Sequence, residues 1–173
     1  MAETVKLDIA AVMSLPRLGF NDTWGCAHDI FHSFGIPVLR YGGVFWEQAM
    51  DTAFADAVAA KRDWLICLDY DSVFNAADVQ AMTQLFFQNP QYTALAPVQS
   101  KRNAEVPLFS VASAAGTVDR APIIDVTSAH FGLTFIRVAD LKDIPRPWFR
   151  SEPGPDGSWK NGKLDADIWF WRQ

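Results

Sequence analysis

The sequence is poor in cysteine and in clustered positive charge. Its 173 residues include two cysteines, Cys26 and Cys67, too few for the disulfide framework of a small secreted domain. The fifteen basic residues face twenty acidic ones, and they adjoin each other only as the pairs at 61–62 and 101–102. Binding along a nucleic-acid backbone requires a basic stripe, so nucleic acid is not an expected partner.

Long apolar runs are also missing. No apolar stretch approaches the ~20 residues that span a bilayer, so no transmembrane segment is expected. The first ten residues contain acidic Glu3 and Asp8, whereas a signal peptide needs a basic start and an apolar run. These features predict a cytoplasmic protein with free thiols.

Apolar and aromatic residues are abundant. Hydrophobic residues make up 50% of the chain and aromatic residues 13%, which is far too apolar for a disordered protein. A chain of this length can bury one substantial core, so residues 1–173 are expected to form a single domain.

Strand and helix patterns alternate along the first hundred residues. Apolar runs predict strands over residues 7–13, 36–39, 64–68 and 93–97. Helical spacing and capping residues predict helices over residues 24–34, 46–60 and 77–87. This alternation predicts an α/β fold with a mostly parallel central sheet flanked by helices, and a ligand site beyond the carboxyl ends of its strands.

The second half is less regular. Residues 101–124 show no clear period, while 131–138 predict a strand and 139–142 a short helix. Residues 150–163 form a polar loop rich in glycine and proline, which is expected to lie near a ligand. Residues 164–171 predict the start of a last helix.

Two aspartates follow the predicted strand 64–68. Side chains at i and i+2 of an extended segment point the same way, so Asp69 and Asp71 are expected to share one volume while Tyr70 faces elsewhere. Paired carboxylates suit Mg²⁺ or Mn²⁺, which fills its other positions with water and substrate phosphates. The alternative is a surface turn in which Asp71 or Ser72 caps the next helix.

Three segments, in order, resemble glycosyltransferases of the GT-A fold. Residues 64–74 (WLICLDYDSVF) are similar to the D-x-D segment of that family. Residues 129–149 resemble a segment of that family in which a small-residue turn is followed by a strand ending in Ile-Arg, a short helix and Pro-Trp-Phe. Residues 166–170 (ADIWF) resemble its Glu-Asp-x-x-Phe segment. The resemblance implies a single Rossmann-like GT-A domain, with a nucleotide-binding half at residues 1–100 and an acceptor-side half at 101–173.

The resemblance also implies an activity. It predicts a metal-dependent transferase that uses a UDP- or GDP-sugar, with a glycan, lipid or protein hydroxyl as acceptor. Asp71 would coordinate Mn²⁺ or Mg²⁺, Asp69 would contact the ribose or the metal's water shell, and Asp167 would act as general base with inversion. The expected nucleotide- and donor-binding residues are Ser14, Pro16, Arg17, Gln48, Asp51, Asp69, Tyr70, His130 and Gly132. Trp148 and Phe149 would form an aromatic platform for donor or acceptor.

Trp159 is a separate candidate. It stands in the polar loop between Gly157 and Gly162, with little local reason to be buried, and tryptophan commonly stacks on sugar rings. We expect it to contribute to the sugar platform.

The sequence departs from the family pattern in three places. The helix predicted over residues 46–60 lacks the Arg-Asn pair that many members direct at the phosphates, and Gln48 and Asp51 are the nearest polar substitutes. Ala166 stands where the family usually has Glu, and the chain stops at Gln173, only six residues after Asp167. These departures predict a truncated acceptor side, and they leave open a non-catalytic sugar-nucleotide or glycan binding module, or a domain of a larger assembly.

Two other functions, a zinc peptidase and a nucleotidyltransferase, match the sequence less well. His28 and His32 have the i, i+4 spacing of zinc peptidases, but Asp29 replaces the usual Glu base. A nucleotidyltransferase should carry a basic, glycine-rich loop after its first strand, and residues 14–20 (SLPRLGF) hold one Gly and one Arg.

Overall fold

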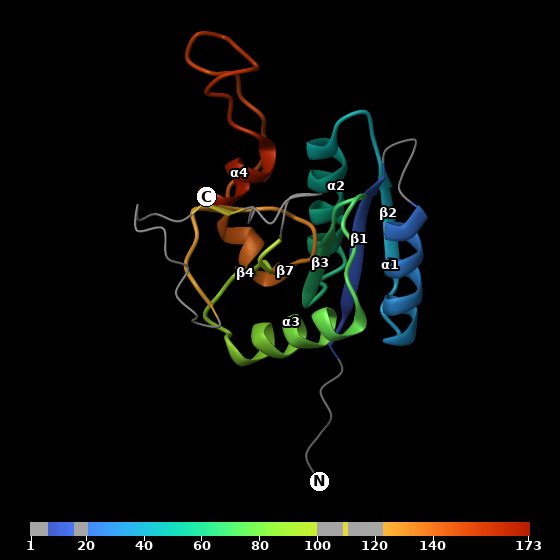
Figure 1. Ribbon diagram of the computed structural model, residues 1–173. Helices are drawn as coiled ribbons and strands as arrows, with labels where there is room; N and C mark the ends of the chain where they lie inside the picture. The colour runs from blue at the N-terminus through green and yellow to red at the C-terminus, as the bar shows by residue number, and fades with distance from the viewer. Residues whose placement is uncertain (1–6, 16–20, 100–108, 111–122) are drawn as a thin grey trace.

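The structure is a computed structural model that describes residues 7–15, 21–99, 109–110 and 123–173 (Figure 1). An open five-stranded sheet has the strand order β2-β1-β3-β7-β4. Its strands are β1 (Ile9–Leu15), β2 (Val38–Gly42), β3 (Trp64–Leu68), β4 (Ala94–Leu95) and β7 (Thr134–Arg137). The helices are α1 (Asn21–Ser33), α2 (Trp46–Ala59), α3 (Ala76–Gln88), α4 (Ala166–Trp171) and the 3₁₀ helix η1 (Val138–Asp143). A separate pair joins β5 (Phe109–Ser110) to β6 (Ser128–Ala129).

The β-α-β pattern of the first half is confirmed. β1 pairs in parallel with β2 on one side and with β3 on the other. All five residues of β3 are buried, which agrees with the uninterrupted apolar run that predicted this strand. The predicted bounds of β3 are those observed, whereas β1 and β2 each begin two residues later than predicted.

The expectation of a mostly parallel sheet needs correction, because the sheet is mixed. β7 runs antiparallel to β3, from the pair Trp64↔Arg137 to the pair Cys67↔Thr134. The edge strand β4 is in turn antiparallel to β7. An antiparallel neighbour begins where its partner ends. The residues just before β7 therefore lie at the carboxyl end of β3.

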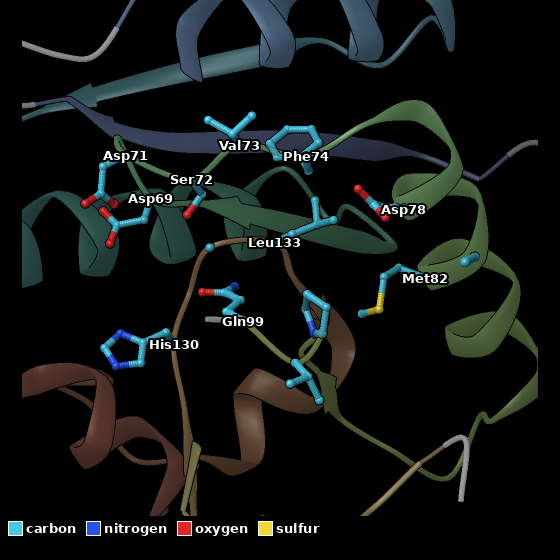
Figure 2. Close-up of a pocket in the computed structure, with 14 residues that line it drawn as sticks. Asp69, Asp71, Ser72, Val73, Phe74, Asp78, Met82, Gln99, His130 and Leu133 are labelled. Carbon is cyan, nitrogen blue, oxygen red and sulfur yellow. The ribbon is translucent and has the colours of Figure 1, made fainter. Parts of the chain in front are cut away.

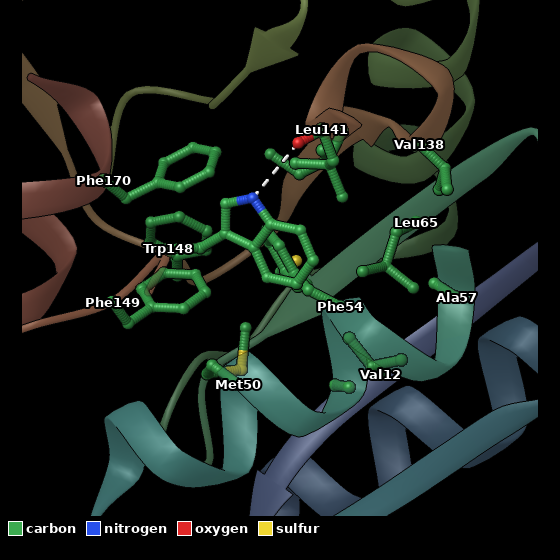
Figure 3. Packing of buried hydrophobic residues seen from close by; sticks show 14 of the residues in the cluster. Val12, Met50, Phe54, Ala57, Leu65, Val138, Leu141, Trp148, Phe149 and Phe170 are labelled. Carbon is green, nitrogen blue, oxygen red and sulfur yellow. Dashed lines mark hydrogen bonds between the residues drawn. The ribbon is translucent and has the colours of Figure 1, made fainter. Parts of the chain in front are cut away.

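Two hydrophobic clusters cover opposite faces of the sheet. Leu65 and Cys67 of β3 belong to one cluster, while the alternate residues Trp64, Ile66 and Leu68 belong to the other. The first packs against α2, η1 and α4, and the second against α1 and α3. Figure 3 shows the aromatic part of the first cluster, where rings from α2, α4 and the segment after η1 meet.

Beyond the sheet, one loop projects from the body. Glu152 and Leu164 exchange two backbone hydrogen bonds of 2.9 Å, and the chain between them extends away from the sheet (Figure 1). In the parts of the chain described here, no helix combines the length and apolar character needed to cross a membrane.

Candidate functional site

A cavity of about 910 Å³ lies at the carboxyl end of β3 (Figure 2). Four segments supply its walls: the loop after β3, the first turns of α3, the residues after β4, and the residues before β7. The described lining residues are Asp69, Asp71, Ser72, Val73, Phe74, Asp78, Ala81, Met82, Pro97, Val98, Gln99, His130, Gly132 and Leu133. The antiparallel entry of β7 explains why residues about 60 positions apart in the sequence share this cavity.

Asp69 and Asp71 lie side by side at one end of the cavity (Figure 2). Asp69 is half-buried and accepts a 2.9 Å hydrogen bond from the backbone N–H of Tyr70, whereas Asp71 is exposed. Burial raises the pKa of Asp69, and the negative charge of Asp71 raises it further. A bound cation would offset the repulsion that the Asp69 carboxylate experiences from Asp71.

The alternative role of Asp71 or Ser72 as a helix cap is wrong. The cap of α3 is Asn75, whose side-chain oxygen accepts hydrogen bonds from the N–H groups of Ala77 and Asp78 at 2.8 and 3.1 Å. The Asp78 carboxylate accepts one from the Asn75 N–H at 2.8 Å, which completes a capping box. Asp71 is therefore not needed to begin this helix.

Gln99, which follows β4, and Gly132, which precedes β7, both line the cavity and lie against each other. With its amide oxygen turned toward the backbone, Gln99 accepts hydrogen bonds from the N–H groups of Gly132 and Leu133 at 3.0 and 3.2 Å. A Cβ at position 132 would come closer than 3.0 Å to the Gln99 side chain and to Ser72 Oγ. Glycine is needed there because two other segments approach the backbone closely.

His130 and Asp167 contact each other beside the carboxylate pair. His130 Nδ1 lies 3.5 Å from Asp167 Oδ2, and Asp167 Oδ1 accepts a 2.8 Å hydrogen bond from the Ile168 N–H. The Asp167 side chain is 18% exposed and that of His130 is 47% exposed. His130 lines the cavity, and Asp167 is not among its lining residues. Burial raises the pKa of Asp167, and the nearby His130 opposes that rise.

Comparisons with known proteins add a fold likeness. No protein-family model matches the chain, and no curated protein sequence matches it. Among solved structures, the chain is similar to one described as the crystal structure of A197 from STIV, with a TM-score of 0.60 and 18% sequence identity. The match covers 94% of this chain and 76% of that chain. At this identity the likeness shows a shared fold and nothing about activity.

Several expected donor-binding residues are absent from the described lining of the cavity. The Asp51 carboxylate instead accepts a 3.1 Å hydrogen bond from the Trp148 N–H and forms an ion pair with Arg146. Asp51 therefore joins α2 to the segment after η1, and does not line the cavity as expected of a donor-binding residue. Gln48 is exposed on α2 and Ser14 is buried in β1; neither lines the cavity. Tyr70 is likewise outside the lining, and Pro16 and Arg17 lie outside the described residues.

The aromatic platform proposed for Trp148 and Phe149 also needs correction. These side chains are only 4% and 3% exposed, and both pack against Phe54 of α2 (Figure 3). The Trp148 indole N–H donates to the carbonyl of Leu141 at 3.2 Å. Their faces are covered by the core, so neither can stack on a sugar. Trp159, by contrast, is 58% exposed in the projecting loop.

The histidine pair of α1 stands apart from the cavity lining. The rings of His28 and His32 stack with centroids 5.9 Å apart on an exposed helix face. In the described ranges, no group of three or more His, Cys, Asp or Glu side chains is placed to hold a metal ion. A metal at Asp69 and Asp71 would thus take its remaining ligands from water and substrate, which is the usual coordination of Mg²⁺.

Sequence reasoning missed Ser72 and Gln99. Gln99 could have been found by the argument that identified Asp69, because it follows the next predicted strand, residues 93–97, at its carboxyl end. Ser72 was considered only as a helix cap. The contact of Gln99 with Gly132 has no local sequence signal.

Proposed function

We propose that this chain is a metal-dependent glycosyltransferase of Rossmann-like GT-A type. It would move a sugar from a nucleotide diphosphate donor to an acceptor hydroxyl, with inversion. The observation that supports this function is the convergence of Asp69, Asp71 and His130 on one cavity, with Asp167 behind His130. A volume of about 910 Å³ falls in the upper range of ligand pockets, which run to about 1,000 Å³, and suits a UDP- or GDP-sugar.

The carboxylate pair fits a divalent metal. Burial and mutual repulsion raise the pKa of Asp69, so a bound cation would relieve an unfavourable pairing of like charges. Mn²⁺ or Mg²⁺ held by Asp71 and Asp69 would neutralise the negative charge on the departing diphosphate. Hard carboxylate oxygens are the ligands that both ions prefer.

The His130 and Asp167 pair would handle the proton. The acceptor oxygen forms a bond to the anomeric carbon while the bond from that carbon to the phosphate oxygen breaks, and the nucleoside diphosphate leaves with the electron pair. His130, which lines the cavity, would take the hydroxyl proton on one ring nitrogen and give the proton on Nδ1 to Asp167, which acts as the general base through the ring. A raised pKa makes the Asp167 carboxylate a stronger base than an exposed aspartate.

A second candidate is a non-catalytic sugar-nucleotide or glycan binding module. Ala166, which stands where the family usually has Glu, is 5% exposed and packs within the first hydrophobic cluster. Its position in the core favours a chain that keeps the fold and the cavity without the family's full catalytic set.

A transfer assay separates the two functions. UDP-, GDP- and TDP-sugars would be tested with Mn²⁺ for donor hydrolysis and transfer, in wild type, Asp71→Ala and Asp167→Asn. Asp143→Asn removes an exposed carboxylate at the end of η1 and serves as the matched control. The proposal expects activity in wild type and control, and its loss in both site variants. Activity that ignores both substitutions contradicts the mechanism, and nucleotide binding without turnover in wild type supports the binding module.

A further inference from the structure

A second cavity, of about 430 Å³, runs along the edge strand β4. Its walls come from α3, from β4 and the residues after it, from residues 123–126, and from Trp171 of α4. Within the described lining, Tyr92, Asp125 and Trp171 alone carry side-chain oxygen or nitrogen atoms. The rest is built of Ala, Val, Leu, Ile, Met and Pro.

The second cavity adjoins the first. Met82, Pro97 and Val98 line both, so one wall passes from the carboxylate site to the apolar cavity. Val98 is 64% exposed although it is apolar, and it stands at this junction.

The apolar lining of the second cavity determines which class of molecule can bind there. A sugar or a nucleotide would lose its hydrogen bonds to water there and find few protein partners, which is unfavourable. An apolar chain gains free energy for each buried methylene. A peptide strand added to β4 would find only Ala94 and Leu95 in strand conformation, which offers little backbone pairing.

We infer that the second cavity binds the alkyl or isoprenoid chain of a lipid acceptor. The chain lies along β4 between α3 and Trp171, and its hydroxyl end crosses Met82, Pro97 and Val98 into the first cavity, which His130 lines. This inference rests on the proposed transferase function, which it narrows from any hydroxyl acceptor to one on an apolar chain.

The test measures binding of a series of primary alkanols, 1-hexanol to 1-dodecanol, to the full chain. Binding is followed by NMR of ¹⁵N-labelled protein through the indole N–H signal of Trp171, assigned with Trp171→Phe. Affinity is expected to rise about fourfold for each added methylene until the cavity is full. The same samples are titrated with UDP and with GDP in the presence of Mn²⁺.

Two variants give the controls. Ala96→Trp places a large side chain in the second cavity, at a position after β4 that does not line the first. Ala59→Trp makes the same change at the exposed end of α2. We expect Ala96→Trp to weaken 1-decanol binding at least tenfold while its nucleotide binding stays within twofold of wild type. Ala59→Trp should bind both as wild type does.

The outcomes separate this inference from the proposed function. Nucleotide binding without any alkanol effect on Trp171 overturns the lipid-acceptor site and leaves the transferase standing. An affinity that does not depend on chain length, or that survives Ala96→Trp, also overturns it. Alkanol binding without nucleotide binding upholds the apolar-chain site and contradicts the transferase.

Discussion

His130 Nδ1 lies 3.5 Å from Asp167 Oδ2, which joins the residues before β7 to the first turn of α4. The partners are 37 positions apart in the chain, and His130 lines the cavity whereas the half-buried Asp167 does not. A half-buried carboxylate that contacts an exposed imidazole can fix the ring's orientation and share its proton.

The pair predicts the kinetics of Asp167→Asn. Asparagine keeps the shape and still accepts the hydrogen bond from the Ile168 N–H, but it cannot take a proton. We expect kcat for transfer to fall by about 10²–10⁴-fold, with the KM for donor within about twofold of wild type. Steady-state kinetics with the active donor checks this, and a kcat within threefold of wild type removes Asp167 from the base role.

The ionised Asp69 carboxylate is expected to destabilise the folded state at neutral pH. Burial and Asp71 raise its pKa above the ordinary value of 3.8, so the folded state holds the proton more tightly than the unfolded state. The stability that this group contributes is present below pH 3.8 and is lost as the pH rises through the folded pKa. Asp69→Asn avoids that loss, and its amide oxygen can still accept from the Tyr70 N–H.

The expected result is a gain of about 1 kcal/mol at pH 7 without metal, or about 2–4 °C in melting temperature. The difference from wild type should vanish below pH 3.8. Calorimetric melting across this pH range, in a chelating buffer, provides the measurement. A lower melting temperature for Asp69→Asn at pH 7 would mean that the carboxylate is a structural group.

Metal binding should reverse that cost. If Mn²⁺ binds the folded chain alone, its stabilisation is RT ln(1 + [Mn²⁺]/Kd), or about 2.7 kcal/mol at a hundredfold excess over Kd. The melting temperature of wild type should rise with the Mn²⁺ concentration and return when EDTA is added. Asp71→Ala should show little rise, and an equal rise in that variant would place the metal elsewhere.

Substitution of Gly132 by alanine should destabilise the fold, whereas the same substitution at Gly25 should not. In Gly132→Ala the new Cβ would displace Gln99 and Ser72, so we expect a loss of about 1–3 kcal/mol. Gly25, in α1, has nothing within 4 Å of its Cβ direction, and Gly25→Ala should gain about 0.5–1 kcal/mol. Urea unfolding of both variants checks the contrast, and equal effects would contradict the close approach at Gly132.

The tryptophans at 148 and 159 should behave in opposite ways. Trp148→Ala removes a 4% exposed ring packed on Phe54 and should cost about 3–5 kcal/mol. Trp159→Ala removes a 58% exposed ring and should change stability by less than about 0.5 kcal/mol. If Trp159 meets a sugar, the second variant raises the KM for acceptor or donor. Thermal melting together with kinetics measures both effects.

Much of the sheet could be predicted because its signals are local. The apolar run of β3 predicts its own bounds, and Asn75 with Asp78 predicts the start of α3 to within a residue. The direction of β7 could not be predicted. A strand's own pattern is the same in parallel and antiparallel pairs, and residues 101–124 give no period that would fix the path of the chain.

The candidate site was predictable at its centre and less so at its edges. Asp69 and Asp71 follow from the two-residue repeat of an extended chain. Trp148 was misassigned because an aromatic residue in a Pro-rich segment has the same local pattern whether it packs in a core or on a ligand. Its burial depends on Phe54 of α2, which contacts it only in the folded chain.

The central claim is that Asp69 and Asp71 together hold a metal and a nucleotide diphosphate in the cavity beyond β3. Isothermal titration of UDP and of GDP, with and without Mn²⁺, into wild type and Asp71→Ala tests it most directly. The account predicts Mn²⁺-dependent binding of at least one nucleotide to wild type and at least tenfold weaker binding to Asp71→Ala. Absence of binding to wild type, or equal binding by both proteins, would contradict it.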